Sequence, residues 1–414
     1  MLDREKVGRA IAEQRRSKGM TQKQLADILN VSYQAVSRWE QGQSLPSVDM
    51  IYDIAQSLET TVDYLLNGLS EERKIIKYED TGLDTRKLYM VKKRIDSLVT
   101  IDRRLLRAKY TEPVFFRFDT SAMDDPVWVS ANHVPGSKER FAMENGYDRE
   151  ICMDLVSSAA NNLIRFGVRP SFLQANVVCG NNDSGQLLLM AEAFKEACER
   201  SKIVFAGMEV SGQAVNYHTG EYRVAASVMG VADRKKMIGG ETITEGDVLI
   251  GLHTEGIASV SYPFIKVILD RRPDALYARI GEQNLFIDEL MKPNTCYVNV
   301  VSELQEQNLV HGVFVITNSL FNRKCYSTIP KGLGACIDVS GISVPALFRY
   351  IEDLNLMDRE CFLKDFALGI GMVLAVPKEE SGRAVEIIKK YHECCRLGMV
   401  QKDDEHPDAR VWLI

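Results

Sequence analysis

The sequence lacks the features that mark several large classes of protein. No apolar run comes near the roughly 18 to 20 residues that a membrane-spanning helix needs. The charged start, Met1-Leu-Asp-Arg-Glu-Lys, contains no apolar signal core. There is also no low-complexity tract and no short repeat. These absences predict a soluble, cytoplasmic protein without a membrane partner.

Metal and disulfide frameworks are absent as well. The nine cysteines form no Cys-x-x-Cys pair, and the densest group, His392-Glu-Cys-Cys395, lacks the spacing of metal ligands. We therefore expect no metal site and no redox motif, and most thiols should be buried in a reducing compartment. The chain is 45% hydrophobic, which excludes a disordered or fibrous protein.

What the chain does have is length and an uneven distribution of charge. Its 414 residues amount to roughly two to three ordinary domains. The net charge of -6 does not indicate nucleic-acid binding. However, residues 1–38 contain eight basic and four acidic side chains, whereas residues 39–69 contain no basic and five acidic ones. One end of this region is therefore positive, as expected of a face that meets phosphates.

Helix signals are dense in residues 1–69. The expected N-cap residues have short polar side chains and are Asp3, Thr21, Ser32, Ser47 and Thr61. Gln24 completes a capping box with Thr21. Gly19, Gly42 and Gly68 follow three of the helices, where glycine suits the left-handed stop. The pattern predicts a compact all-α bundle of five short helices.

Residues 21–42 read Thr-Gln-x-x-Leu-Ala-x-x-Leu-x-Val-Ser-x-x-x-Val-Ser-x-Trp-Glu-x-Gly. This pattern, followed by Pro46 and Val62-Asp-Tyr-Leu-Leu-Asn-Gly68, resembles the phage-repressor (Cro-type, XRE) helix-turn-helix. The resemblance implies a recognition helix over residues 32–41 that enters the major groove of double-stranded DNA. The candidate DNA-binding residues are Gln22, Lys23, Ser32, Tyr33, Gln34, Ser37 and Arg38.

Of these candidates, Gln22 and Lys23 lie where the family contacts phosphate, and the others belong to the recognition helix. The alternative is a helical module that only mediates assembly. Because a single module covers few base pairs, we expect a homodimer or higher homo-oligomer on a palindromic operator. The rest of the chain should supply the dimer interface.

Residues 70–109 are predicted to form a linker and a connecting helix, with a helical pattern from Leu88 to Lys109 that carries many basic residues. We favour a solvated helix face over an auxiliary phosphate-binding patch. Beyond Pro113 strands and helices alternate. Strands are expected at 127–130, 177–179, 203–206, 224–229, 247–252, 313–316 and 371–376, and helices at 153–163, 187–198, 259–269, 344–351 and 384–391.

A boundary near Gly239-Gly240 divides this body into two halves, 110–239 and 240–414. The predicted fold class is an all-α helix-turn-helix module followed by a two-part α/β (α+β) body.

The body carries a series of motifs in a fixed order. They include Tyr78-Glu-Asp-Thr-Gly-Leu-Asp84, the stretch from Pro126 to Glu144, Asp154-Leu-Val, and Phe366-x-Leu-Gly-Ile-Gly-Met-Val-Leu-Ala-Val-Pro377. Residues 77–414 thereby resemble aminoimidazole ribonucleotide synthetase (AIR synthetase), an ATP-dependent cyclo-ligase of purine synthesis, and its superfamily. The resemblance implies dimerisation through the first half. The candidate ligand-binding residues that survive are Asp80, Asp84, Lys138, Asn161, Glu209 and His218.

The chain departs from this family where the magnesium and phosphate chemistry should lie. His133 and Asn162 stand in place of two aspartates, and Ile316-Thr-Asn-Ser-Leu320 stands in place of a triple-glycine loop. Loss of these carboxylates should remove the electrostatic stabilisation that phosphoryl transfer needs. Lys138 and Glu209 can alternatively hold loop geometry, and His133 and His218 are better read as ordinary polar residues than as metal ligands.

These observations predict a sequence-specific transcriptional regulator with a catalytically inactive, AIR-synthetase-like body for dimerisation and ligand sensing. No cofactor is certain, and the candidate ligand is an ATP-like nucleotide or a purine-pathway metabolite. One alternative is an active ATP-dependent enzyme, which the loss of acidic residues disfavours. A second alternative is a scaffold in a defence or stress complex.

Overall fold

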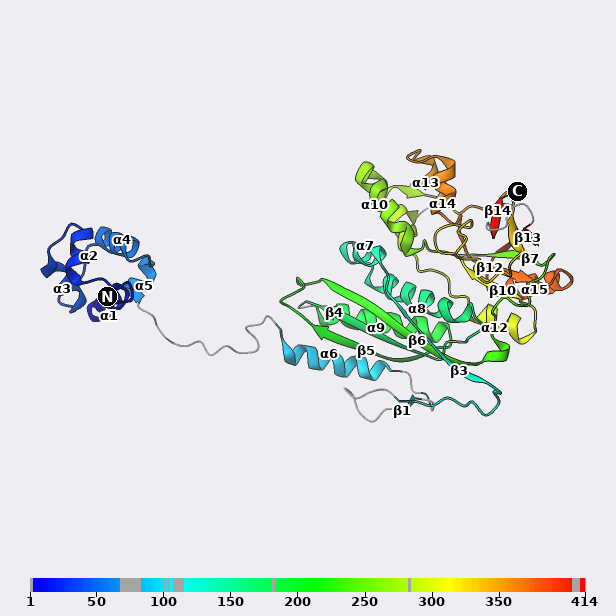
Figure 1. Ribbon diagram of the computed structural model, residues 1–414, viewed down its shortest axis with the longest axis horizontal. Helices are drawn as coiled ribbons and strands as arrows, with labels where there is room; N and C mark the ends of the chain where they lie inside the picture. The colour runs from blue at the N-terminus through cyan, green and yellow to red at the C-terminus, as the bar shows by residue number, and fades with distance from the viewer. Residues whose placement is uncertain are drawn as a thin grey trace. The chain divides into compact units, whose positions relative to one another are not determined.

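In a computed structural model the chain forms two compact units, Met1–Asp80 and Thr81–Ile414 (Figure 1). The structure describes residues 3–67, 83–99, 102, 105–106, 115–180, 183–281, 284–403 and 410–413. Within these ranges, no helix is both long and apolar enough to cross a membrane.

The first unit is the expected bundle of five helices. They are α1 (Arg4–Ser17), α2 (Gln22–Ile28), α3 (Tyr33–Glu40), α4 (Val48–Ser57) and α5 (Val62–Asn67). Side chains of Asp3, Thr21, Ser32 and Ser47 accept hydrogen bonds from backbone N–H groups in the first turns of α1 to α4. The capping box of Thr21 and Gln24 is confirmed. Val7, Ile11, Leu25, Val36 and Leu65 are buried in a shared core.

The connecting helix is shorter than predicted. Helix α6 (Thr85–Leu98) begins after Asp84, and strand β1 (Leu105–Leu106) pairs with β2 (Phe115–Phe116) in an antiparallel ladder. The prediction of a helix as far as Lys109 is therefore wrong. The physical reason is the β-branched run Val-Thr-Ile at 99–101, which disfavours helix and favours extended backbone.

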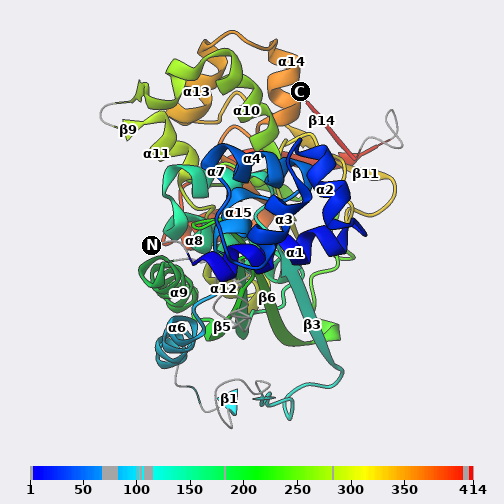
Figure 2. The same cartoon turned by 90° about the vertical axis from the view of Figure 1, so that its left-hand side faces the viewer.

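The first half of the body is a four-stranded sheet in the order β3-β6-β4-β5. The strands are β3 (Pro126–His133), β4 (Phe172–Cys179), β5 (Val204–Gly212) and β6 (Tyr222–Asp233), and the helices are α7 (Ser137–Asn145), α8 (Asp148–Ile164) and α9 (Ser184–Arg200). Strands β4 and β5 run parallel, whereas β6 is antiparallel to β3 and β4. Helices α8 and α9 cover one face of the sheet (Figure 2).

The second half is a six-stranded sheet in the order β10-β12-β7-β13-β11-β14. Its strands are β7 (Val248–His253), β10 (Gly312–Val315), β11 (Leu333–Ile337), β12 (Ile370–Val376), β13 (Cys394–Lys402) and β14 (Val411–Leu413). Its helices are α10 (Tyr262–Arg271), α11 (Phe286–Met291), α12 (Val298–Glu306), α13 (Ala346–Asp353), α14 (Arg359–Asp365) and α15 (Ser381–Ile388). A further pair, β8 (Arg279–Ile280) and β9 (Asn284–Leu285), forms a small hairpin.

The expected boundary near residue 240 lies between β6 and β7, the last strand of one sheet and the first of the other. Buried hydrophobic residues from both halves nevertheless form one continuous cluster, so the halves pack against each other. This packing matters because segments from the two halves meet in a cleft.

Candidate DNA-binding face and cleft

Helix α3 separates its polar and apolar residues cleanly. Val36 and Trp39 are buried in the core of the bundle. On the other side, Tyr33 is 50% exposed, and Gln34 and Arg38 are also exposed. Gln34 and Arg38 are four residues apart and therefore lie one turn apart on the same helix face. The structure thus brings these predicted contact residues together on an open surface.

Three other candidates have partners within the module. The Ser32 hydroxyl accepts the backbone N–H of Ala35 at 3.2 Å, and the Ser37 hydroxyl accepts from the Gln41 amide at 3.3 Å. The Gln22 amide donates to a carboxylate oxygen of Glu40 at 2.7 Å. Their side chains therefore help to shape the module. Lys23, the remaining candidate, is exposed on α2.

A buried ion pair that sequence reasoning missed holds α1 to α3. Nε of Arg15 lies 2.5 Å from Oε1 of Glu40, and Nη2 lies 2.9 Å from Oε2. The two side chains are only 8% and 5% exposed. Because Glu40 also accepts from Gln22, one carboxylate connects three helices. This arrangement fixes the orientation of α3, with the guanidinium in a bidentate geometry.

Gly8 allows α1 and α3 to approach closely. A Cβ atom at this position would lie 2.3 Å from the carbonyl oxygen of Trp39 and 2.9 Å from that of Glu40. Real side-chain carbons do not tolerate such distances, so any larger residue must push the helices apart. Nothing local in the sequence signals this role, because Gly8 sits inside a regular helix.

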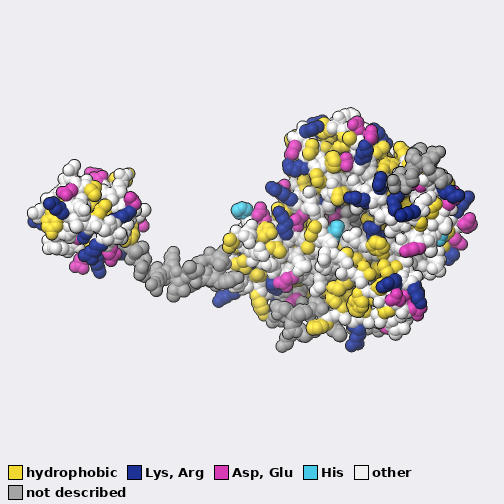
Figure 3. Space-filling model, in the orientation of Figure 1, with side chains coloured by type: hydrophobic (Ala, Val, Ile, Leu, Met, Phe, Trp, Pro, Cys, Tyr) yellow, Lys and Arg dark blue, Asp and Glu magenta, His cyan; other side chains and the backbone are white. Residues whose placement is uncertain are grey.

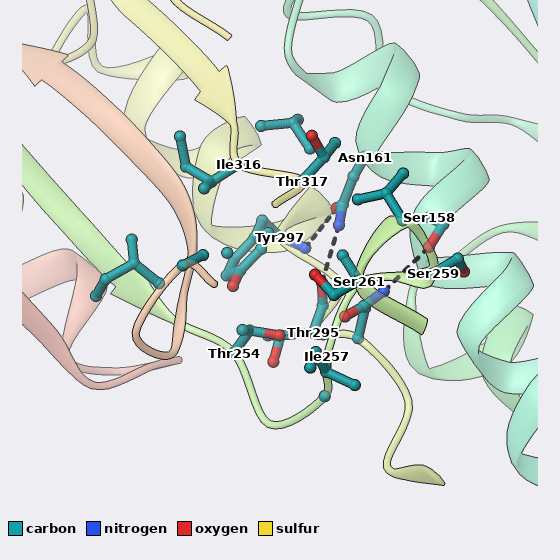
Figure 4. A pocket seen from close by; sticks show the side chains of 18 of the residues that line it. Ser158, Asn161, Thr254, Ile257, Ser259, Ser261, Thr295, Tyr297, Ile316 and Thr317 are labelled. Carbon is teal, nitrogen blue, oxygen red and sulfur yellow. Dashed lines mark hydrogen bonds between the residues drawn. The ribbon is translucent and has the colours of Figure 1, made fainter. Parts of the chain in front are cut away.

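In the body, a cleft lies between the two halves. Counted with the solvent at its mouth, it encloses about 760 Å³. The first half contributes His133 at the end of β3, with Ser158, Asn161 and Asn162 on α8. The second half contributes residues from three places. They are the segment after β7, residues 294, 295 and 297 just before α12, and residues around the ends of β10 and β12. Figure 4 shows this cleft from close by.

Asn161 is the predicted ligand-binding residue that lines this cleft. Its amide nitrogen donates to the carbonyl of Thr295 at 2.9 Å, and its amide oxygen accepts the backbone N–H of Tyr297 at 3.0 Å (Figure 4). Both polar groups of Asn161 therefore join α8 to the second half. This side chain builds the wall of the cleft and holds the halves together.

His133 and Asn162, the two departures from the family pattern, meet in the same cleft. Nδ1 of His133 lies 3.5 Å from Nδ2 of Asn162. Burial lowers the pKa of His133 below its ordinary value of 6.5, and the nearby Asp154 offsets part of this effect. The imidazole is therefore neutral near pH 7.

Lys138 does not reach the cleft, although it is among the predicted ligand-binding residues. Its ammonium is completely buried and lies 2.7 Å from Oδ1 of Asp154. It also donates to the carbonyls of Lys292 at 3.0 Å and Ile257 at 3.4 Å. Lys138 therefore joins α7 and α8 to two loops of the second half. In this position its side chain holds the loops in place, which is the alternative role considered for Lys138 above.

The remaining candidates lie apart from the cleft. Asp84 caps α6 by accepting the backbone N–H of Lys87 at 2.9 Å. Glu209, on β5, is 63% exposed and pairs with Lys92 of α6 at 2.6 Å. His218 is exposed in the turn between β5 and β6, and Asp80 lies outside the described residues. The structure therefore does not gather the five described candidates into one site.

A metal centre is not assembled by the described part of the chain. Within it, no group of three or more His, Cys, Asp and Glu side chains is placed to hold an ion. Most of the nine thiols were expected to be buried. The structure buries Cys152, Cys179, Cys198, Cys325 and Cys336.

Comparisons with known proteins match one family model to each of the two units of the chain. A helix-turn-helix family model matches residues 11–65, and the model of the AIR synthase related protein, C-terminal domain, matches residues 244–407. Phosphoribosylformylglycinamidine cyclo-ligases of Bacillus cereus and Bacillus anthracis are each 28% identical to this chain over 324 residues, which is 77% of this chain and 94% of theirs.

Two solved structures share the fold of the body. Thiamine-monophosphate kinase from Stenotrophomonas maltophilia aligns with a TM-score of 0.58 and 12% identity, covering 78% of this chain and 94% of its own. HypE from E. coli, a hydrogenase maturation protein, aligns with a TM-score of 0.52 and 15% identity, covering 79% and 93%.

The protein is thus a fusion of a helical domain and an α/β body. Its helical domain is an XRE-type helix-turn-helix, which supports DNA binding, and its body is of the AIR synthase related fold.

Proposed function

We propose that this protein is a sequence-specific transcriptional regulator whose body forms a dimer and senses a small ligand. The observation that carries the proposal is the open polar face of α3 on an intact helix-turn-helix. Tyr33, Gln34 and Arg38 stand exposed there, while Val36 and Trp39 anchor the helix from behind. A module that served only for assembly would have no need of this polar set.

The residue types on α3 suit base readout. An arginine pairs bidentately with guanine and a glutamine with adenine, and each such pair contributes about 1 to 3 kcal/mol of discrimination. Lys23, on α2, is placed to contact phosphate, which carries affinity but no sequence information. The two kinds of residue should therefore respond differently to mutation.

The test is to select the operator from genomic fragments at physiological salt and to measure binding by fluorescence anisotropy. Arg38→Ala should weaken operator binding by about 1 to 3 kcal/mol and reduce the preference for operator over scrambled DNA. Lys23→Ala should weaken both complexes about equally and lower the salt dependence. Arg140→Ala, which removes an exposed arginine of the body, is the matched control. An unchanged preference in Arg38→Ala would overturn the proposal.

Dimerisation through the first half is part of the proposal. Trp128 of β3 is 64% exposed on the sheet face opposite α8 and α9, and Phe118 packs edge-on against it with ring centroids 4.4 Å apart. Figure 3 shows hydrophobic side chains gathered over β3 and β6 on this face. Exposed aromatic surface of this kind is typical of interfaces. Two protomers joined here would present two recognition helices to a palindromic operator.

Light scattering of the full chain tests this interface. We expect a dimer, and Trp128→Arg should shift it toward monomer and weaken operator binding. Tyr277→Arg, which changes a side chain that is also 64% exposed but on the second half, should leave the dimer intact. A monomeric parent protein would refute this part of the proposal.

We also propose that the body has lost the reaction of its relatives. A magnesium nucleotide would need carboxylates for the ion and cationic or backbone donors for the phosphates. The described residues that line the cleft include no Asp, Glu, Lys or Arg, so they do not fit such a group. ATP hydrolysis with magnesium should stay at the background rate, and robust turnover that His133→Ala abolishes would favour an enzyme instead.

A further inference from the structure

The cleft between the halves has a lining that suits one class of ligand. We propose that it binds an uncharged, hydrogen-bonding heterocycle of the nucleobase or nucleoside type, without a phosphate group and without a divalent cation. This proposal deepens the ligand-sensing part of the proposed function and rests on it.

The first argument is charge. Among the described lining residues there are polar amides, hydroxyls and one imidazole, but no ionised side chain at pH 7. Asp154, the buried carboxylate beside His133, is already paired with Lys138 at 2.7 Å and accepts the backbone N–H of Asn294 at 2.8 Å. A phosphate placed in this cleft would lose its hydration without gaining a counter-charge, which is costly. A neutral ligand avoids that cost.

The second argument is a set of polar atoms that have no hydrogen-bond partner among the described residues. The amide nitrogen of Asn162 lies 3.5 Å from Nδ1 of His133. The amide nitrogen of Asn294 lies 3.5 Å from the Ser158 hydroxyl. Within the described residues, no bond is made by the amide oxygens of Asn162 and Asn294 or by the Ser259 hydroxyl. All three side chains are half-buried at the cleft. Together they offer acceptors and a donor at the cleft, as the edge of a neutral base requires.

The third argument is the apolar wall. Ile257, Ile316, Phe348 and Ile370 line the cleft together with its polar groups. Figure 4 shows Ile316 on the far side of the cleft from Ser158 and Ser259. A ligand with a polar edge and an apolar ring face would satisfy both sides, whereas a fully polar molecule would leave the apolar wall wet.

Isothermal calorimetry on the full chain in the absence of DNA tests the proposal. The probes are adenosine, guanosine, cytidine, uridine and their free bases, each compared with the nucleoside 5′-monophosphate and with ATP and magnesium. At least one neutral probe should bind, its monophosphate should bind at least about tenfold more weakly, and EDTA should change neither affinity.

Two variants report on the site itself. Asn162→Asp adds a charge without adding volume and should weaken the best neutral probe by at least about tenfold. Asn216→Asp makes the same change in an exposed turn and should have no effect. Ser259→Ala removes a hydroxyl without burying a charge and should weaken binding severalfold. This second variant keeps the test valid if Asn162→Asp does not fold.

Three outcomes would overturn the proposal. One is that no neutral probe binds at about 1 mM. Another is that ATP with magnesium binds more tightly than every neutral probe and that EDTA abolishes this binding. The third is equal affinity in Asn162→Asp, Ser259→Ala and the Asn216→Asp control. Because operator binding is measured separately, a protein that binds a nucleoside but not DNA would overturn the regulator and leave the cleft assignment standing.

Discussion

On α3 three side chains predicted to contact DNA, Tyr33, Gln34 and Arg38, are exposed. In the body, by contrast, most side chains predicted to hold a ligand are bonded to other parts of the protein. Arg38 and Gln34 share one helix face with solvent in front of them. Lys138 and Asn161 join the two halves of the body instead. The difference teaches that a site built on one continuous helix follows its motif, while a site built from distant segments does not.

The largest loss of stability is expected at the buried ion pair of the body. Lys138→Ala leaves the Asp154 carboxylate buried without a counter-charge, so the body should lose about 3 to 5 kcal/mol of stability. Unfolding in urea, followed by circular dichroism, should show the transition of the body shifted and that of the helix-turn-helix unchanged. Lys266→Ala, which breaks an exposed pair with Asp270, is the control and should shift neither transition measurably. A stable Lys138→Ala body would contradict the structural role.

The corresponding change in the module is Glu40→Gln. It leaves the Arg15 guanidinium nearly buried without its carboxylate, and we expect a loss of about 3 kcal/mol confined to the module. Operator affinity should fall with it, because Gln22 and Arg15 both position α3 through Glu40. Glu59→Gln removes an exposed partner of Lys18 and should preserve both stability and DNA binding. Equal effects of the two substitutions would contradict this reading.

A smaller effect is expected where α1 touches α3. Gly8→Ala places a methyl group against the backbone carbonyl of Trp39 and should destabilise the module by about 1 to 3 kcal/mol. Alanine ordinarily stabilises a helix relative to glycine, so the sign itself is the test. Gly382→Ala is the matched control, because Gly382 lies in α15 and a Cβ there meets nothing within 4 Å. A more stable Gly8→Ala module would show that the close approach does not matter.

The smallest expected effect is a difference in pH response. The module contains no histidine, whereas burial lowers the pKa of His133 and of His392 in the body below 6.5. Below about pH 6.5 the unfolded chain takes up protons that the folded body refuses, so the stability of the body falls as the pH is lowered. Urea unfolding between about pH 7 and about pH 5.5 should show this decrease for the body, and His133→Gln should reduce it. A stability of the body that does not change over this interval would rule out the effect.

Much of the fold could be predicted from local patterns. All five helices of the module and their caps follow from short-range chemistry, as Thr21 and Gln24 illustrate. The strands β11, β13 and β14 escaped prediction because their residues do not alternate, and β13 carries Gly398 at a positive φ beside an irregular register. The connecting helix was predicted too long because its basic residues continue past Leu98, where the backbone becomes extended. For β11, β13 and β14 the deciding factor is pairing with strands distant in the sequence, whereas the early end of α6 has the local cause given above.

The sequence by itself determined the helix-turn-helix and the kind of body attached to it. These features depend on caps, periodicity and motif spacing, which act over a few residues. Only the tertiary structure decided that Lys138 is buried and joins the two halves, and that Glu209 is exposed and pairs with Lys92. It also decided that His133 contacts Asn162 in an uncharged cleft. The physical reason is that the burial and desolvation of a side chain are not set by the segment of sequence that contains it. They arise when residues separated by tens to hundreds of positions pack together.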